Sequence, residues 1–198
     1  MTVEWIRGTG YYANSYLCGN VLFDAGILPD QISGYCDVID TIILTHCHYD
    51  HIAHLMEIKA LTGAEVCIHS LDAPGLSEGR SNLSMMFGER SPGIIPDRLL
   101  ADGDIVSGIK IIHTPGHTPG GICGYIEDEK ALISGDTVFT DGGYGRCDFP
   151  GGSAGDLEKS IEKLSGYDVE GLYPGHGIPV ISNGKGHILS ALKMIRLY

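Results

Sequence analysis

The chain has 198 residues, enough to bury a sizeable core, and 43% of them are hydrophobic. Its 13 basic and 25 acidic side chains give a formal net charge of −12, and no run of Lys or Arg is present. A chain this acidic is poorly suited to neutralise phosphates, so nucleic acid is not expected as a main partner.

Neither a membrane segment nor a targeting segment is expected. No apolar run approaches the roughly 20 residues that a membrane-spanning helix needs, and residues 1–10 show no basic segment followed by an apolar one. The six cysteines form no CxxC pair, which is typical of small buried side chains in a reducing compartment. We therefore expect a cytoplasmic protein without membrane association.

Short β-rich runs dominate the chain and are separated by Gly, Asn, Asp and Pro turn signals. The expected strands are residues 2–6, 15–18, 21–23, 41–44, 66–68, 109–112, 122–126 and 131–133. Helical spacing appears three times, in the sets Ile52, Leu55, Met56, Ala60; Leu157, Ile161, Leu164; and Ile188, Leu192, Ile195. Strands interleaved with helices indicate an α/β protein whose sheets are covered by helices. Residues 71–104 fit neither period, and no linker or repeat divides the chain, so residues 1–198 are expected to form one domain.

The most informative stretch is TIILTHCHYDH, residues 41–51. A buried strand is followed by four potential metal ligands within six positions, which are His46, His48, Asp50 and His51. Such polar groups are costly to bury together without compensation. A divalent cation supplies that compensation, because imidazole and carboxylate are good ligands for Zn²⁺ or Fe²⁺. The pattern HxHxDH therefore predicts a metal site.

Three further candidates stand where expected strands, at residues 109–112, 131–133 and 171–173, pass into loops. They are His117 in HTPGHTPGG, Asp136 in LISGDTVF and His176 in LYPGHG. Each is next to glycine, which lets the backbone come close to a site and direct a side chain into it. Together with HxHxDH, they are expected to complete the ligand set.

The set THCHYDH, PGHTPG, SGDTVF and PGHG, in this order, resembles the metallo-β-lactamase superfamily and, within it, the glyoxalase II-like hydrolases. The resemblance implies a four-layer αββα sandwich, with two mixed sheets flanked by helices and metals at one edge. It also implies two divalent ions, Zn foremost and Fe or a mixed Zn/Fe pair as the alternative. In the family pattern, His46, His48 and His117 hold the first metal; Asp50, His51 and His176 hold the second; and Asp136 bridges them. Asp24, in LFDAG, resembles the family's aspartate that hydrogen-bonds a ligand.

The segment GRCDFPGGS, residues 145–153, resembles a second family motif. Its basic residue, Arg146, is expected to bind the thiol-side carboxylate of a substrate, because a guanidinium suits carboxylates. Asp148 is acidic where full-length relatives have an aromatic residue, and the family's C-terminal helical domain, which helps to bind glutathione, is not expected in this chain. The irregular stretch contains an apolar patch, Met85, Met86 and Phe87. This patch, and Met86 in particular, is expected to contact the acyl group of the substrate.

The reaction that this set favours is hydrolysis of a thioester or a similar activated acyl compound, with a metal-bridging hydroxide as nucleophile steered by Asp50. Because the expected nucleophile is this hydroxide, a covalent acyl-enzyme is not expected. The main alternative is a persulfide dioxygenase of the same fold. The segment GRCDF resembles the GRxDF motif of those enzymes. Such an enzyme would use one iron on His46, His117 and Asp136. The same residues would also suit a lactonase, a phosphodiesterase, a β-lactamase or a non-enzymatic metal-binding protein.

Overall fold

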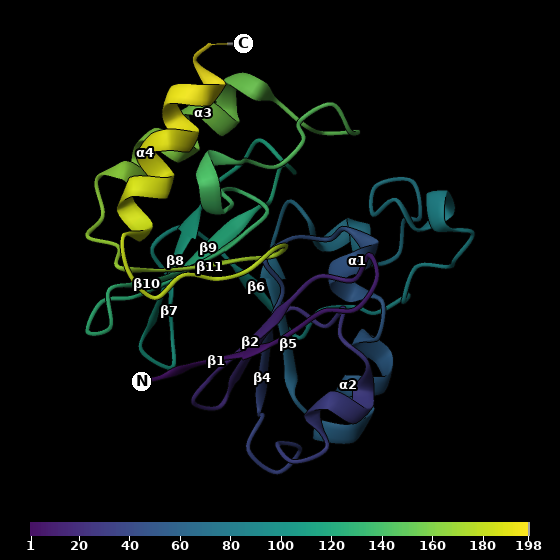
Figure 1. Ribbon diagram of the computed structural model, residues 1–198. Helices are drawn as coiled ribbons and strands as arrows, with labels where there is room; N and C mark the ends of the chain where they lie inside the picture. Colours follow the sequence, from purple (N-terminus) through teal and green to yellow (C-terminus); the bar gives the residue numbers. More distant parts are fainter. Residues whose placement is uncertain (198) are drawn as a thin grey trace. The chain divides into compact units, whose positions relative to one another are not determined.

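The computed structural model describes residues 1–197, which form two compact units. The N-terminal unit holds Thr2–Leu100, and the C-terminal unit holds Met1 and the chain from Ala101 onward. Each unit contains one β-sheet and its own helices (Figure 1).

The N-terminal unit contains a six-stranded sheet in sequence order. Its strands are β1 (Val3–Ile6), β2 (Ser15–Cys18), β3 (Val21–Phe23), β4 (Thr41–Ile43), β5 (Glu65–His69) and β6 (Arg98–Leu100). β1, β2 and β3 pair antiparallel, whereas β3 to β6 pair parallel, so the sheet is mixed. The helical elements are η1 (Pro29–Ile32), α1 (Tyr49–Ile52), α2 (Leu55–Thr62), η2 (Ala73–Leu76) and η3 (Ser84–Phe87).

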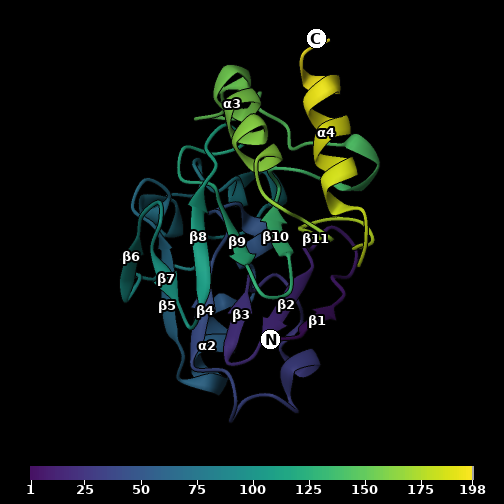
Figure 2. The same cartoon turned by 90° about the vertical axis from the view of Figure 1, so that its left-hand side faces the viewer.

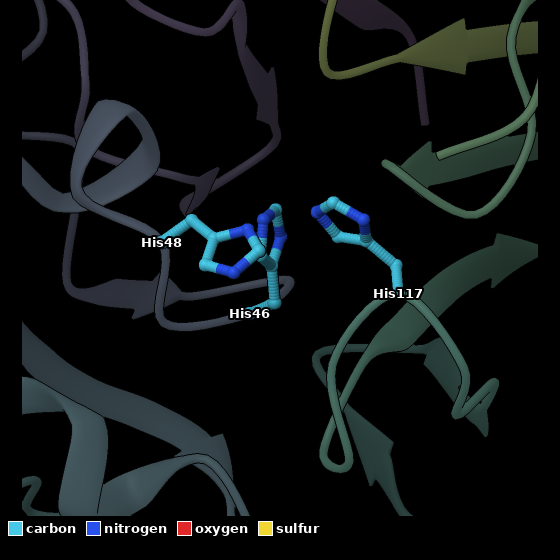
Figure 3. A group of neighbouring side chains, drawn as sticks. All are labelled: His46, His48 and His117. Carbon is cyan, nitrogen blue, oxygen red and sulfur yellow. The ribbon is translucent and has the colours of Figure 1, made fainter. Parts of the chain in front are cut away.

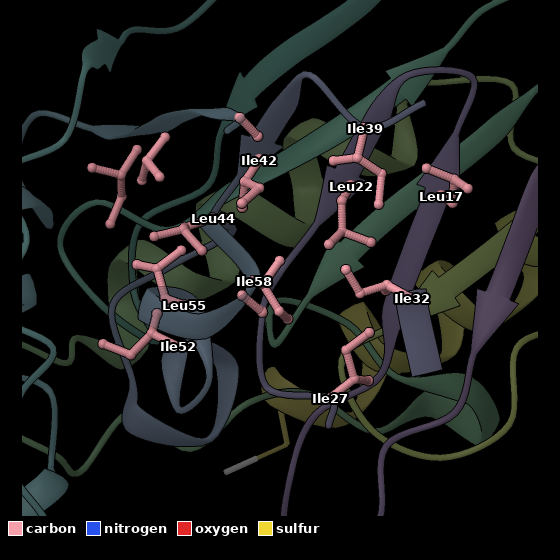
Figure 4. Packing of buried hydrophobic residues seen from close by; sticks show 14 of the residues in the cluster. Leu17, Leu22, Ile27, Ile32, Ile39, Ile42, Leu44, Ile52, Leu55 and Ile58 are labelled. Carbon is pink, nitrogen blue, oxygen red and sulfur yellow. The ribbon is translucent and has the colours of Figure 1, made fainter. Parts of the chain in front are cut away.

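The core of this unit lies between the sheet and its helices. Every residue of β3 and β4 is buried, as expected for continuous apolar runs in parallel strands. Leu55 and Ile58 of α2 belong to one cluster with Leu22 and Ile42 from these two strands (Figure 4). The end of β4, and the loop that follows it, are therefore held by a closely packed core.

The C-terminal unit contains a five-stranded sheet in the order β11-β10-β9-β8-β7. Its strands are β7 (Ile105–Val106), β8 (Ile109–His113), β9 (Ile122–Ile126), β10 (Ala131–Gly135) and β11 (Gly171–Pro174). Only β10 and β11 pair parallel; Figure 2 shows the strands from β8 to β11 in this order. The helical elements are η4 (Thr140–Gly142), α3 (Ala154–Ser165) and α4 (Gly184–Ile195).

The two long helices of this unit share one hydrophobic cluster with the sheet. Leu157 and Ile161 of α3 and Ile188 of α4 pack with Leu132 and Leu172 from the strands. The N-cap residue of α3 is Ser153, whose Oγ accepts a hydrogen bond from the Asp156 amide (3.3 Å).

The prediction of an α/β fold with two mixed sheets flanked by helices is confirmed. Three details differ. The helical spacing after Asp50 corresponds to two short helices, α1 and α2. The irregular stretch contains a strand, β6, that pairs with β5. The short strand β7, which pairs with β8, was not expected from the sequence. Within residues 1–197, every helix is too short or too polar to cross a lipid bilayer. The single domain over residues 1–198 stays a prediction.

Candidate metal centre

Four of the predicted ligands lie together in the N-terminal unit, directly after β4. The rings of His46 and His48 meet edge-on with centroids 4.7 Å apart, and those of His46 and His51 are 4.0 Å apart. All three imidazoles are buried. The Asp50 Oδ2 atom lies 3.9 Å from Nε2 of His51, and the Asp50 side chain stays 19% exposed. This group brings together nitrogen and carboxylate donors, with the carboxylate partly open to solvent.

The buried carboxylate of Asp24 orients this group. Its Oδ2 atom lies 2.8 Å from Nδ1 of His51, and its Oδ1 atom accepts the Thr45 amide at 2.7 Å. Asp24 has a φ of 59°, in the left-handed region that Asp tolerates better than most residues. Because Nδ1 of His51 pairs with a carboxylate, Nε2 is the nitrogen left to bind a metal. Asp24 therefore has the position expected of a residue that orients the His51 ring for metal binding.

Thr45 also contacts the ligand group, and the sequence alone did not single it out. Its hydroxyl donates to Asp24 Oδ2 at 2.8 Å and lies 3.1 Å from Nδ1 of His46. Because the hydroxyl hydrogen goes to the carboxylate, the oxygen accepts from the His46 ring. The sequence signal that could have identified Thr45 is a hydroxyl residue directly before HxH, after an apolar strand.

The other three predicted ligands lie together in the C-terminal unit. His117 follows β8, Asp136 follows β10 and His176 follows β11. The Oδ2 atom of Asp136 is 3.6 Å from Nε2 of His117 and 3.6 Å from Nε2 of His176. These distances exceed those of good hydrogen bonds. They place one carboxylate oxygen between two imidazole nitrogens, the arrangement expected of a bridging ligand.

The segment at Gly145 comes very close to these ligands. The Nδ1 atom of His117 lies 2.5 Å from the carbonyl oxygen of Arg146, so Nδ1 donates and Nε2 faces Asp136. A Cβ atom at Gly145 would lie 2.0 Å from the Asp136 carbonyl oxygen and 2.9 Å from Nδ1 of His117. Only glycine allows this approach. The motif GRCDF therefore positions His117 through its backbone, which the sequence did not predict.

The Arg146 side chain already has a partner. Its Nε and Nη2 atoms donate to the two carboxylate oxygens of Asp148 at 2.9 and 2.7 Å, and its guanidinium lies 4.2 Å from the Phe149 ring centroid. The hydrogen bond between them raises the pKa of Arg146 and lowers that of Asp148. Both side chains are exposed. A substrate carboxylate would have to compete with Asp148 for this guanidinium.

Two further residues lie outside the ligand groups. Cys47, between His46 and His48, lies in the hydrophobic cluster of the N-terminal unit, and burial raises the pKa of its thiol well above the usual range. Its place in this cluster is that of a packing side chain. Met86 lies in η3 and is 70% exposed.

The donor chemistry of both groups fits a divalent metal ion. Figure 3 draws three of the imidazoles: His46 and His48 come from the loop after β4, and His117 comes from the loop after β8. The seven predicted ligands are imidazoles and carboxylates, the set that suits Zn²⁺ or Fe²⁺. The two imidazoles whose Nδ1 atoms pair with Asp24 and with the Arg146 carbonyl are oriented as metal-binding histidines usually are.

Comparisons with known proteins agree with this interpretation. The Lactamase_B family, described as the metallo-beta-lactamase superfamily, matches residues 8–176. A probable metallo-hydrolase of Methanocaldococcus jannaschii is 36% identical over 191 residues, which cover 87% of this chain and 91% of that protein. The hydroxyacylglutathione hydrolase GloC of Haemophilus influenzae is 36% identical over 177 residues, covering 81% of this chain and 82% of that one.

Solved structures agree as well. The crystal structure of TTHA1623 in a di-iron-bound form matches with a TM-score of 0.81 at 29% identity, covering 90% of this chain and 95% of that chain. The chain belongs to the metallo-β-lactamase superfamily and is a metal-dependent hydrolase of that fold.

Proposed function

We propose that the two ligand groups together hold two divalent ions, with Zn²⁺ as the foremost choice. In this proposal His46, His48 and His117 bind one ion; Asp50, His51 and His176 bind the other; and Asp136 bridges the two. The family match over residues 8–176 supports this, because it includes all seven side chains. The position of the Asp136 carboxylate oxygen, 3.6 Å from each of two imidazole nitrogens, supports the bridging role.

The proposed reaction is hydrolysis of a thioester of a small molecule. The observation that carries it is the similarity to a hydroxyacylglutathione hydrolase at 36% identity over 82% of that enzyme. We place the reaction in the cytoplasm, where thiols stay reduced, because all six cysteines of the chain are free.

Bound divalent ions lower the pKa of a water molecule towards 7 and polarise a carbonyl oxygen. The chain's own residues hold the donors in place. Asp24 and the Arg146 carbonyl keep Nε2 of His51 and of His117 available as ligand atoms. The Asp50 carboxylate is partly exposed, and it would accept a hydrogen bond from the attacking water and so orient it. A thiol has a pKa of about 8.5, so the thiolate leaves without a strong general acid.

The test combines metal analysis with a substrate panel. The purified protein is expected to contain two metal ions per chain and to hydrolyse thioesters. Asp136→Asn is expected to lose at least one ion and most of the activity, because a neutral amide bridges two cations poorly. One iron per chain, with oxygen uptake on a persulfide and no thioester hydrolysis, would establish the persulfide dioxygenase instead.

A further inference from the structure

Two segments far apart in the sequence form backbone hydrogen bonds with helix α1, which contains Asp50 and His51. The amide of Ala13 donates to the carbonyl oxygen of Asp50 at 3.0 Å. The amide of Tyr49 donates to the carbonyl oxygen of Asn82 at 2.7 Å. The N-terminal segment and the irregular stretch therefore both have fixed positions relative to the residues that carry the ligands.

The base of the irregular stretch is buried and hydrogen-bonded. Asn82 is fully buried, and its side chain donates to the Gly75 carbonyl at 2.7 Å and accepts the Ser84 amide at 3.0 Å. Leu83 has a φ of 64°, a strained conformation for a residue with a branched side chain. Such strain persists only where the surroundings enforce it, and it often marks functional segments. The 3-10 helix η3 follows this hydrogen-bonded segment directly.

An aromatic pair joins the two segments at the surface. The rings of Tyr11 and Phe87 stack with centroids 4.7 Å apart and an interplanar angle of 23°. Phe87 also lies 5.6 Å from the ring of Tyr49, the residue between the ligands His48 and Asp50. Tyr11 is 46% exposed and Phe87 is 39% exposed. The neighbouring residues in η3, Met85 and Met86, are exposed as well.

We propose that the stacked pair of Tyr11 and Phe87 receives the acyl group of the substrate and selects apolar or aromatic acyl groups; this rests on the proposed function. Phe87 of the pair contacts Tyr49, which precedes Asp50 in α1. Four partly exposed side chains offer well under the about 800 Å² that each partner contributes to a standard protein interface. The surface therefore fits a small apolar group better than a second protein.

The first experiment compares acyl preferences. The variants Tyr11→Ala and Phe87→Ala are assayed on acetyl, octanoyl and phenylacetyl thioesters of one thiol. We expect kcat/KM to fall about tenfold for the octanoyl and phenylacetyl substrates and less than about twofold for the acetyl substrate. Tyr11→Phe keeps the ring and removes only the hydroxyl that donates to Tyr12, so it should keep the wild-type preference. Ile181→Ala, which shortens an 83% exposed side chain in the other unit, is the surface control.

A binding measurement separates this inference from the proposed reaction. Titration calorimetry of the metal-loaded protein with octanoate and with acetate is expected to show tighter binding of octanoate, and Tyr11→Ala should abolish the difference. If octanoate binds more tightly in this way but no thioester is hydrolysed, the acyl-binding site is supported and the proposed reaction is contradicted.

The opposite result would overturn the inference. Thioester hydrolysis with an unchanged acyl preference, and equal octanoate binding in folded Tyr11→Ala and Phe87→Ala, would exclude an acyl site. A change of oligomeric state in these variants, with unchanged preference, would assign the surface to contact between copies of the chain.

Discussion

The carboxylate of Asp24 lies 2.8 Å from Nδ1 of His51, and the same oxygen accepts the hydroxyl of Thr45 at 2.8 Å. Because that hydroxyl also lies 3.1 Å from Nδ1 of His46, one buried carboxylate orients two imidazoles. Both rings then have Nε2 as the nitrogen left for a metal. The Asp of LFDAG is therefore coupled to HxHxDH through side chains 21 to 27 positions apart in the chain.

Asp24→Asn is expected to weaken metal binding by about 10- to 100-fold, because a neutral amide holds His51 less firmly in the required tautomer. The measurement is competition with a chelator of known affinity. Thr45→Val should weaken binding at His46 by a smaller factor, whereas Thr45→Ser keeps the hydroxyl and should restore it. Equal affinity of wild type and Asp24→Asn would show that the carboxylate serves only folding.

Gly145→Ala is expected to destabilise the protein by about 1–3 kcal/mol or more and to reduce metal content, because the added methyl group meets the Asp136 backbone. Denaturant unfolding and metal analysis check both effects. Gly155→Ala, in the same unit, is the matched control: a Cβ there meets nothing within 4 Å, and α3 should become slightly more stable. If the Gly145→Ala variant proved as stable as this control, the close approach would be contradicted.

The sequence predicts those features of the site that depend on local pattern. A buried strand followed by HxHxDH has to place its ligands at the strand end, and His117, Asp136 and His176 also follow strands. The helices α3 and α4 carry clear helical spacing, and their apolar faces pack as that spacing requires. These signals come from single stretches of chain, so no tertiary information is needed to detect them.

The features that were missed depend on partners distant in the chain or on loop geometry. The strand β6 has the sequence RLL, too short for a pattern, and exists because it pairs with β5. The role of Thr45 depends on hydrogen bonds to Asp24, which lies 21 positions earlier in the chain, so it cannot be found from the local pattern. The pairing of Arg146 with Asp148 depends on the course of an irregular loop, which residue types alone do not determine.

Alkaline pH is expected to destabilise the protein through buried thiols. Burial raises the pKa of Cys18 to about 12 and that of Cys123 to about 11. A thiol in the unfolded chain titrates near pH 8.5, so the stability contribution is complete below that pH and is lost as pH rises towards the folded-state pKa. The loss amounts to about 1.4 kcal/mol per pH unit for each thiol.

The measurement is the free energy of unfolding at several pH values between about 8 and 10.5, a range that lies around and above the titration of a free thiol. Cys123→Ala removes one of these thiols. The free energy of unfolding should then fall less steeply with pH, by the contribution of one thiol, although the variant starts from a lower stability. An identical slope in wild type and variant would show that Cys123 does not contribute.

Arg146 is expected to bind a substrate carboxylate only in competition with Asp148. Arg146→Ala should raise KM for a glutathione thioester, which carries thiol-side carboxylates, by about tenfold, because a charge-assisted hydrogen bond is lost. Asp148→Asn should lower the same KM, because it weakens the hold on both guanidinium nitrogens that now donate to the carboxylate. The pair is exposed, so neither change should affect folding. A thioester of a thiol without carboxylates is the control substrate and should respond to neither variant. Equal shifts on both substrates would mean that Arg146 acts only by positioning its loop, through the carbonyl that His117 contacts.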